Sequence, residues 1–411
     1  MRKLHLSTAV ILLVAAAGAF AAVTTTTVPF AVDSSNQAGW WSPLEVYGGT
    51  VYMAFNGPGA SAGNHKIQVA KRNSSGVWTL LTATNQNGAV PYFTDDIGHN
   101  QPSIARDGQG YLHVFGSMHH QPWVYFRSDT PGQDPIDHAP DMPDQGKNIT
   151  YPVMQTAADG DVYLIARVGD DANTRRVGKL YRWDDASDTW SIVATFASEY
   201  DRTVYPDDIQ IDASGDIHIL YEWAKYPAVG FRHKLSYLRY TPSTNVWYDS
   251  SGAQVSVPRT TATSDVIQDL VSGEAWSNSN SYTGPAVQSA KLSVAGGVKV
   301  VYRHRDVEGG VFKVKSAWPS GGAWNRELVY SAGETTAALG ITYTGSEKRV
   351  YYVKASGTDR AFVAKKNAGS YTHESLTPGK PIERLAVVRY NGTDHLYLMD
   401  VPNSTLFYAT K

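Results

Sequence analysis

The sequence predicts an all-β protein, a seven-bladed β-propeller, from three observations. A unit of about fifty residues recurs along the chain, with a proline near a strand start, a glycine-containing turn and an alternating strand. No helical periodicity interrupts these units. A tryptophan closes a later turn in several of them, at Trp78, Trp190, Trp247 and Trp324. Short strands repeated at this period are typical of propellers.

Seven copies of the unit are expected. The best-defined copy contains short strands at Ser103–Arg106, Tyr111–Gly116 and Trp123–Arg127. The other copies are Pro43–Phe55, Pro152–Ile165, Pro206–Leu220, Pro285–Val301 and two looser ones that end at Val350–Val353 and Leu396–Met399. Length alone favours two or three domains. The repeat is stronger evidence than the length and predicts one propeller domain over residues 23–411.

Residues 1–22 have the features of a signal peptide. Arg2 and Lys3 precede an apolar run at Ala9–Ala17, and small residues follow it. The run is too short to span a membrane and is followed by polar threonines. We therefore expect cleavage near Ala21 or Ala22 and a secreted or periplasmic protein without a membrane span.

The composition excludes several classes of function. The net charge is −2 and no run of lysine or arginine is present, which argues against a nucleic-acid partner. The chain has no cysteine, so disulfides and thiol catalysis are excluded. We expect a monomer.

The two ends of the propeller are expected to meet. Thr24–Val32 is rich in β-forming residues, and the last unit ends with a strand at Leu406–Thr410. A propeller must close its ring, so we expect the N-terminal segment to supply the outer strand of the last blade. Closure would also remove an exposed sheet edge.

Two segments do not fit the repeat. Asp129–Asn148 is rich in aspartate and proline, and its carboxylates could hold a structural Ca²⁺. A solvated acidic loop is the favoured interpretation, because no fixed ligand spacing is present. Ala253–Thr283 is a long insertion between the fourth and fifth units, and we expect a binding loop or lid there.

Polar and aromatic residues are predicted to converge on one rim of the propeller. In an antiparallel meander, the start of the first strand and the end of the second lie at the same edge. His99 precedes one strand and His119 follows the next, so their imidazoles should meet there. The residues expected at this rim from the first five units are Trp40, Trp41, His99, Asn100, His119, His120, Tyr151, Arg167, Tyr205, Trp223, Arg232, His233, Tyr282, Arg303, His304 and Arg305. An aromatic and cationic rim suits an anionic polysaccharide, which stacks on rings and pairs with guanidinium groups.

Each of these residues also has a plainer interpretation. Arg167 could pair with Asp170 or Asp171, and a tyrosine beside a proline is often only packing. His113 and His218 occupy strand positions inside the units and are interpreted as structural. Convergence of several residue types on one edge favours a functional site over these alternatives.

The stretch HNQPSIARDGQGYLHVFGSMHHQPWVYFRS, followed by Tyr151-Pro152 and Arg167, resembles the seven-bladed polysaccharide lyases of the ulvan-lyase type. These belong to the neuraminidase-repeat (BNR) group of propellers. The resemblance implies His99, His119, Tyr151 and Arg167 as catalytic residues. It further implies a substrate-contacting tyrosine at Tyr205. The neighbouring rim residues expected to bind substrate are Trp41, Asn100, His120, Trp223, Arg232, His233, Arg303 and Arg305.

The chemistry implied by the resemblance is β-elimination at a uronic acid. Arg167 would neutralise the carboxylate, and His99 or Tyr151 would remove the C5 proton while the same or the opposing residue protonates O4. The step requires no metal or organic cofactor. The family match of His119 could also fall on His120, and any structural metal cannot be located from the sequence.

Two other classes of function stay open. A sialidase-like glycoside hydrolase needs a carboxylate pair, which Asp95-Asp96, Asp207-Asp208 or Glu222 could supply. A carbohydrate-binding propeller would need no chemistry. The favoured reading is a lyase acting on an ulvan-like polymer of sulfated rhamnose and glucuronate or iduronate, and this preference rests on the resemblance.

Overall fold

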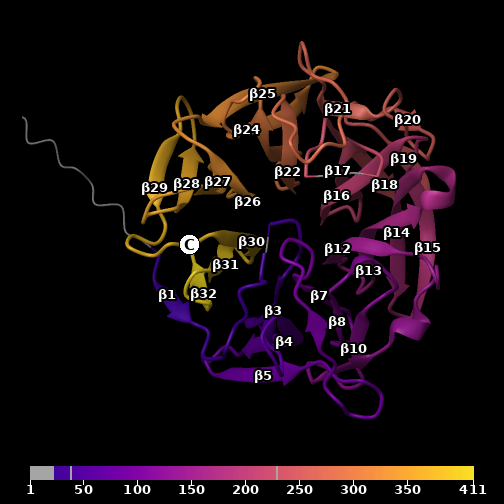
Figure 1. The fold of residues 1–411 in the computed structure, drawn as a ribbon, viewed down its shortest axis with the longest axis vertical. Coiled ribbons are helices and arrows are strands. Elements are labelled where there is room, and N and C mark those ends of the chain that lie inside the picture. Colours follow the sequence, from indigo (N-terminus) through magenta and orange to yellow (C-terminus); the bar gives the residue numbers. More distant parts are fainter. Residues whose placement is uncertain (1–22, 38, 228–229) are drawn as a thin grey trace, which may run out of the picture.

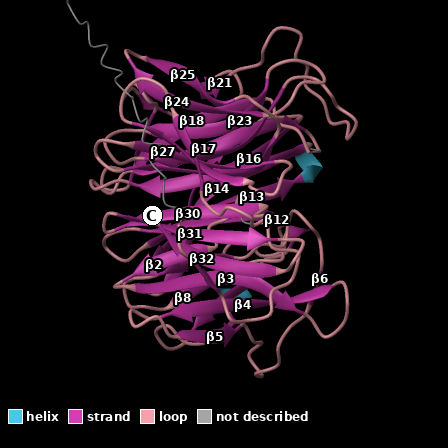
Figure 2. Cartoon of the chain, turned by 90° about the vertical axis from the view of Figure 1, so that its left-hand side faces the viewer, coloured by secondary structure: helices cyan, strands magenta, loops and turns pink. Residues whose placement is uncertain are grey.

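The computed structural model describes residues 23–37, 39–227 and 230–411. These residues form β-strands, loops and two short 3₁₀ turns, η1 at Ala139–Asp141 and η2 at Asp171–Asn173 (Figure 2). Within these ranges no helix has the length and apolar character needed to cross a membrane. The expected signal peptide lies outside the described residues.

The strands of the described part of the chain form six hydrogen-bonded sheets. Five of them are antiparallel and small. The first sheet contains β2 Leu44–Tyr47, β3 Thr50–Pro58, β4 Asn64–Arg72 and β5 Trp78–Thr82, with β6 Phe93–Thr94 beside β4, and the second contains β7 Ser103–Arg106, β8 Leu112–Phe115, β10 Tyr125–Ser128 and β11 Pro135–Asp137. Two later sheets contain β22 Ala286–Ser293, β23 Lys299–Arg305, β24 Lys313–Ser320 and β25 Ala323–Tyr330, and β26 Thr335–Tyr343, β27 Lys348–Lys354, β28 Ala361–Lys366 and β29 Thr372–Ser375. The last sheet contains β30 Arg384–Tyr390, β31 Thr393–Asp400 and β32 Thr405–Thr410, with β1 Thr25–Thr27 beside β32.

The remaining sheet has eleven strands and contains two antiparallel groups. A short parallel pairing of β14 with β16, at Arg175–Arg202 and Arg176–Thr203, joins them. The strands are β12 Ile149–Thr156, β13 Val162–Asp170, β14 Arg175–Asp184 and β15 Thr189–Ala197, with β9 His119–Gln121 beside β12; and β16 Arg202–Ile211, β17 Ile217–Lys225, β18 Lys234–Thr241 and β19 Val246–Tyr248, with β20 Gln254–Val255 and β21 Asp265–Gln268 at its edge.

The sheets follow one another around a circle in chain order (Figure 1). The first strand of each group faces the centre, where a cavity of about 800 Å³ lies. Its lining includes one apolar residue from most of these strands: Val46, Met154, Ile211, Leu292, Ile341 and Val388.

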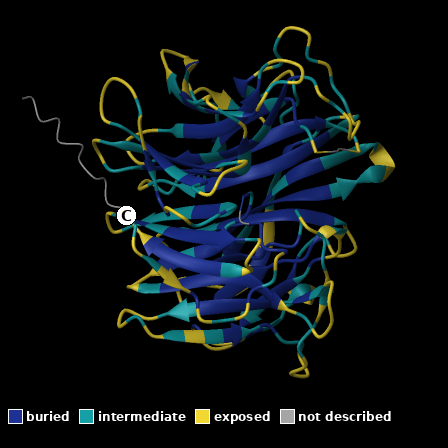
Figure 3. Cartoon of the chain, turned by 60° about the vertical axis from the view of Figure 1, so that its left-hand side comes forward, coloured by how far each residue is buried: buried dark blue, intermediate teal, exposed yellow. Residues whose placement is uncertain are grey.

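The core lies between neighbouring sheets. All four residues of β8 are buried, and so are the first eight residues of β17. Both faces of such a strand are therefore covered. One hydrophobic cluster joins β3 and β4 to β8, and another joins β8 to β13. Figure 3 shows the buried strands and the exposed loops that connect them.

Several sequence expectations need local correction. His119 and His120, which the sequence places after a strand, belong to a strand of their own, β9, which pairs with β12. The acidic segment Asp129–Asn148 contains a short strand, β11. The insertion Ala253–Thr283 contains β20 and β21, and β21 pairs with β18. In each case a neighbouring strand edge supplies hydrogen bonds that local propensity does not reveal.

The N-terminal segment pairs with the last sheet, as the sequence predicts. Thr25–Thr27 of β1 lies antiparallel to Phe407–Ala409 of β32, and the two strands are side by side in Figure 1. The Val28 amide donates to the Leu406 carbonyl at 2.9 Å. Val28 and Val32 are buried in the cluster shared with the first sheet.

Deletion of residues 24–32 should lower the melting temperature by about 5 °C or more. Burial of each valine contributes roughly 1.5–3 kcal/mol, and a loss of this size shifts melting by several degrees. Thr26→Ala, which changes an exposed side chain on β1, serves as the control and should melt within about 1 °C of the parent protein. Equal melting of the deletion and the parent in calorimetry would contradict the role of this strand.

Candidate active site

The site is built around an irregularity at the start of β12. The ladder between β12 and β13 shifts between Thr150 and Val153, so Tyr151 and Pro152 are left out of the regular pairing. Proline has no N–H to donate, which suits a bulge. Tyr151 has a left-handed backbone with φ of 58°. A strained non-glycine residue of this kind is held in place by its surroundings and is typical of functional sites.

Two imidazoles share one carboxylate at the neighbouring sheet. His99 Nδ1 is 2.9 Å from Asp96 Oδ1, and His119 Nδ1 is 2.5 Å from Asp96 Oδ2. The rings of His99 and His119 are stacked, with centroids 3.5 Å apart and planes 6° from parallel. Because the carboxylate accepts, each Nδ1 donates and each Nε2 is left with a lone pair.

The surroundings keep His99 neutral. Burial lowers its pKa to about 4, although the hydrogen bond to Asp96 opposes this shift. The two imidazoles in turn lower the pKa of the Asp96 carboxyl, against the effect of its burial. The His99 side chain is 24% exposed and that of His119 is 41% exposed, so both rings reach solvent. His99 is therefore an unprotonated and accessible base at neutral pH.

Arg167 lies under the two tyrosines of the site. Its guanidinium carbon is 4.8 Å from the ring centroid of Tyr151 and 4.9 Å from that of Tyr205. Its Nη2 donates to the Thr150 hydroxyl at 3.1 Å. The residue is only 2% exposed.

Arg167 has no carboxylate within 4.0 Å among the residues that the structure describes. The alternative that it pairs with Asp170 or Asp171 is wrong. Asp170 binds Arg175 at 2.6 Å and Asp171 binds Arg176 at 3.2 Å. These arginines extend from β14 toward the same turn, while the Arg167 side chain lies against the tyrosines.

Tyr151 is kept as a neutral phenol. Burial raises its pKa to about 12, and the neighbouring Tyr205 adds to the shift, whereas Arg167 and Arg232 oppose it. The Tyr151 ring centroid is 5.8 Å from that of His99 and 5.3 Å from that of Tyr205. Tyr151 can therefore donate a proton at neutral pH beside a base that accepts one.

A second guanidinium and two indoles complete the aromatic cluster. Arg232 lies 3.8 Å from the ring centroid of Tyr205 and 5.4 Å from that of Trp40. Unlike Arg167, it has a counter-ion, since its Nε is 3.5 Å from Glu222 Oε2. Trp41 packs against Tyr151 in the same cluster.

The adjacent residues His119 and His120 direct their side chains to different partners. His119 stacks on His99, whereas His120 Nε2 lies 3.1 Å from Asp171 Oδ2 and 3.2 Å from Asn148 Nδ2. His120 has a left-handed φ of 55°. The geometry therefore supports His119 over His120 as the partner of His99.

Several rim residues predicted from the sequence do not join this cluster. Trp223 is fully buried and donates to Ser264, and His233 is buried against Glu274. Arg303 and Arg305 are buried in the next sheet. Arg303 donates to Gln288, and Arg305 donates to the carbonyls of Gly284 and Tyr282. A role of these four residues in substrate binding stays a prediction. Asn100 is also buried, and its side-chain oxygen accepts from the Asp96 amide.

Sequence reasoning missed the role of Asp96, which it considered only as a hydrolase carboxylate. The i, i+3 spacing of Asp96 and His99 was the available signal. Trp40 was expected at the rim but not assigned a role, and the structure places it over Arg232.

Asp96, His99 and His119 are also close enough to hold a metal ion, with donor atoms within 4.8 Å of one another. A metal bound by an imidazole nitrogen lies in the plane of the ring. Two parallel rings 3.5 Å apart cannot both satisfy this condition, so one ring would have to rotate. The observed geometry therefore fits two imidazole N–H groups that donate to the Asp96 carboxylate better than it fits a bound metal ion.

The aspartates of the Asp129–Asn148 loop bind protein groups. Asp129 and Asp141 flank His138, and Asp144 accepts from Lys179 and Tyr181. Asp134 accepts from the Thr82 amide.

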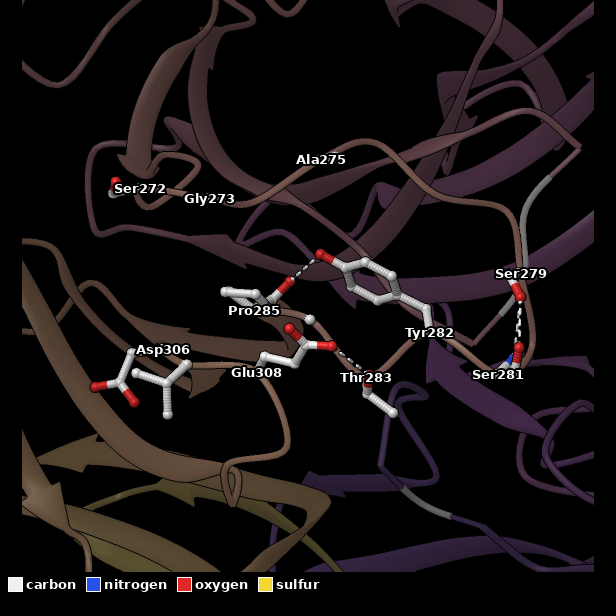
Figure 4. A pocket seen from close by; sticks show the side chains of 12 residues that line it. Ser272, Gly273, Ala275, Ser279, Ser281, Tyr282, Thr283, Pro285, Asp306 and Glu308 are labelled. Carbon is white, nitrogen blue, oxygen red and sulfur yellow. Dashed lines mark hydrogen bonds between the residues drawn. The ribbon is translucent and has the colours of Figure 1, made fainter.

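A separate cavity of about 560 Å³ lies beside the insertion (Figure 4). It is lined by Ser279, Ser281, Tyr282 and Thr283 together with Asp306 and Glu308 from the loop after β23. The Thr283 hydroxyl donates to Glu308 and the Tyr282 hydroxyl donates to the Pro285 carbonyl. None of the lining residues belongs to the site formed by Asp96, His99, His119, Tyr151 and Arg167.

Residues 50–331 match the family described as "BNR repeat-containing family member". No curated protein matches the sequence. The fold is similar to that of a PL25 ulvan lyase solved with bound -[GlcA(1-4)Rha3S]-, with a TM-score of 0.68 and 15% identity over 95% of this chain and 96% of that chain. It is also similar to the polysaccharide lyase Uly1, with a TM-score of 0.64 and 14% identity over 94% and 90% of the two chains. At these identities the likeness shows the fold.

The His99 imidazole should titrate near pH 4, well below the ordinary value of about 6.5. The measurement is a pH series of imidazole NMR signals, with the His99 signal assigned by its loss in His99→Ala. Asp96→Asn removes a hydrogen bond and a charge that raise this pKa, so its midpoint should move lower still. A midpoint near 6.5 in the parent protein would contradict the burial of this ring.

Proposed function

The chain belongs to the BNR repeat-containing family, and we propose that it is a polysaccharide lyase that cleaves a uronic-acid-containing polysaccharide by β-elimination. The observation that carries this proposal is the Arg167 guanidinium, which is buried near two accessible imidazoles and has no carboxylate partner in the described part of the chain. Burying an unpaired charge is costly. A site that retains one favours an anionic ligand, and a uronate carboxylate matches the planar guanidinium.

His99 is the proposed base. The C5 proton of a uronate becomes more acidic when a cation neutralises the adjacent carboxylate, which is the task of Arg167. His99 Nε2 then accepts the C5 proton, and the electrons of the C–H bond form the C4–C5 double bond. The imidazolium that results is stabilised by the Asp96 carboxylate on its Nδ1 side. Stacked His119 shares the same carboxylate and holds the His99 ring in orientation.

Tyr151 is the proposed acid. The bond between C4 and O4 breaks as the double bond forms, and the departing oxygen takes the phenolic proton of Tyr151. Its raised pKa keeps that proton in place until O4 leaves. Arg167 lies beside the ring, and the charges of Arg167 and Arg232 stabilise the phenolate that forms. The product carries an unsaturated uronate at its new non-reducing end.

The substrate we infer is an ulvan-like polymer of sulfated rhamnose and glucuronate or iduronate. A structurally similar lyase was solved with -[GlcA(1-4)Rha3S]-, and the aromatic cluster of Trp40, Trp41 and Tyr205 offers ring faces for stacking.

The wider proposal concerns the whole chain. We infer that the antiparallel groups are seven blades of one propeller domain over 23–411, closed by β1, and that residues 1–22 are a signal peptide. The protein would act outside the cytoplasm as a monomer. Its chemistry would require no metal or organic cofactor, and a structural Ca²⁺ remains compatible with the proposal.

A hydrolase is less well supported. Such an enzyme needs two carboxylates beside the scissile bond. Asp207 and Glu222 are fully buried, Asp95 binds His65, and both oxygens of Asp96 are taken by imidazoles. A carbohydrate-binding propeller without chemistry would not need a base and an acid in contact with one cluster.

The test of the function is ultraviolet absorbance during incubation with a panel of uronic-acid polysaccharides. A lyase forms a conjugated double bond, a hydrolase forms only reducing ends, and a binding protein forms neither. His99→Ala should lower turnover by about 10²-fold or more, the range for losing an acid–base group. His119→Ala should have a larger effect than His120→Ala. His373→Ala, at an exposed imidazole of β29, is the control. Full turnover in both His99→Ala and His119→Ala would contradict the assignment.

Arg167→Lys should lower turnover by about ten-fold or more, because lysine keeps the charge but loses the planar fork. Arg167→Ala should lower it further, in line with about 2–4 kcal/mol for one electrostatic stabiliser. The melting temperature should fall by only a few degrees, because the hydrogen bond to Thr150 and the ring contacts are lost but no ion pair among the described residues is lost. Initial rates of unsaturated product are measured beside melting curves. An Arg167→Ala protein that melts early and turns over normally would assign Arg167 to structure.

A further inference from the structure

The buried histidine His65 is hydrogen-bonded through both ring nitrogens. His65 Nδ1 is 2.7 Å from Asp95 Oδ1, and Nε2 is 2.6 Å from the Ser117 hydroxyl. The Asp95 carboxylate accepts, so Nδ1 carries the proton and Nε2 accepts from Ser117. The order Asp–His–Ser is that of a serine-hydrolase triad. However, the His65 ring is fully buried and has no exposed surface from which to pass a proton to a substrate.

The two partners of His65 belong to the segments that carry Asp96, His99 and His119. Asp95 directly precedes Asp96, which binds both imidazoles. Ser117 lies two residues before His119. His65 itself comes from β4 of the preceding sheet, where it pairs with Phe93 of β6. One imidazole therefore ties both segments to a strand of the preceding sheet.

The backbone around Ser117 depends on such ties. Ser117 and His120 both have left-handed φ angles, 56° and 55°, although neither is glycine. The Ser117 amide donates to the Asn100 carbonyl at 3.3 Å, and the Asn100 side chain accepts from the Asp96 amide. Conformations of this kind persist only where the surroundings determine them.

We propose that His65 is a positioning residue of this site, which fixes Asp96 and His119 so that the His99 and His119 rings stack on one carboxylate. This inference rests on the proposed lyase function. His65 touches neither substrate nor the reacting atoms, and it acts through Asp95 and Ser117. Its loss should misplace the base while the carboxylate site at Arg167 stays intact.

The chain offers a matched control in His113. It is fully buried, its Nδ1 is 2.7 Å from the Tyr125 hydroxyl, and its Nε2 is 3.1 Å from Asp107 Oδ2. Asp107 lies in the turn before β8, whereas Ser117 follows the other end of this strand. Replacing His113 therefore removes the same kind of network from the end of β8 remote from the cluster.

The experiment compares His65→Leu with His113→Leu, and adds Ser117→Ala, which removes one hydrogen bond without a change of fold. Both leucine variants should melt earlier. Only His65→Leu should lower kcat, by about 10- to 100-fold, because a small misplacement of a catalytic group has that effect. KM should stay within about two-fold, since Arg167 and the aromatic cluster still hold the substrate. Ser117→Ala should change kcat in the same direction by a smaller factor.

A second readout needs no substrate. Stacked rings shift each other's proton NMR signals, so the His99 and His119 signals should move toward unstacked values in His65→Leu and stay in place in His113→Leu. Unchanged signals and unchanged kcat in His65→Leu would overturn the proposal, as would equal losses of kcat in the two leucine variants. If the parent protein forms no unsaturated product, the lyase function fails, and the NMR comparison still decides the role of His65.

Discussion

Each sheet buries both of its faces against its neighbours, and this packing constrains every polar group on the strands. The strands β8 and β17 have almost no exposed residue. A polar side chain on such a strand must find a partner in the same or the next sheet, or lie at the strand end where a ligand can reach it. The site occupies these ends. His99 precedes β7, Tyr151 lies in the bulge of β12, and Arg167 lies near the end of β13.

Two buried arginines near this end of the strands show the two possibilities for such a side chain, a charged partner in the protein or only neutral neighbours. Arg232 pairs with Glu222, and the low-dielectric surroundings raise the pKa of that carboxyl to about 7. Arg167 instead has one hydroxyl and two ring faces. Cation–π contacts and one neutral hydrogen bond stabilise a guanidinium less than an ion pair does. Among the described residues Arg167 therefore has no counter-ion, whereas Arg232, which also lies against Tyr205, has one.

The sequence predicted the elements well and the side-chain partners poorly. The strand expected at Ser103–Arg106 is β7. The order of strands in an antiparallel meander was enough to predict that His99 and His119 meet at one edge. Period-two alternation could not show that Trp223 would face the core between the two antiparallel groups of the eleven-stranded sheet. The choice between His119 and His120 depends on a left-handed backbone at His120, which no local propensity indicates. Pairing of β9 with β12 and the carboxylate shared by two imidazoles are long-range features. They depend on how sheets meet, and a single sequence does not encode that in its periodicity.

The buried histidines show how one local arrangement takes different roles. His113 and His218 each bind a tyrosine hydroxyl through Nδ1 and an aspartate through Nε2, and in both cases the aspartate lies six residues earlier in the preceding turn. These two repeat the same stabilising unit in two different parts of the fold. His65 departs from that pattern, because its aspartate and its hydroxyl come from segments 30 and 52 residues away. A local network stabilises the sheet that contains it, whereas a network between distant segments fixes their relative position. The segments that His65 joins are those that hold Asp96 and His119, so its hydrogen bonds link the packing of two sheets to the geometry of the site.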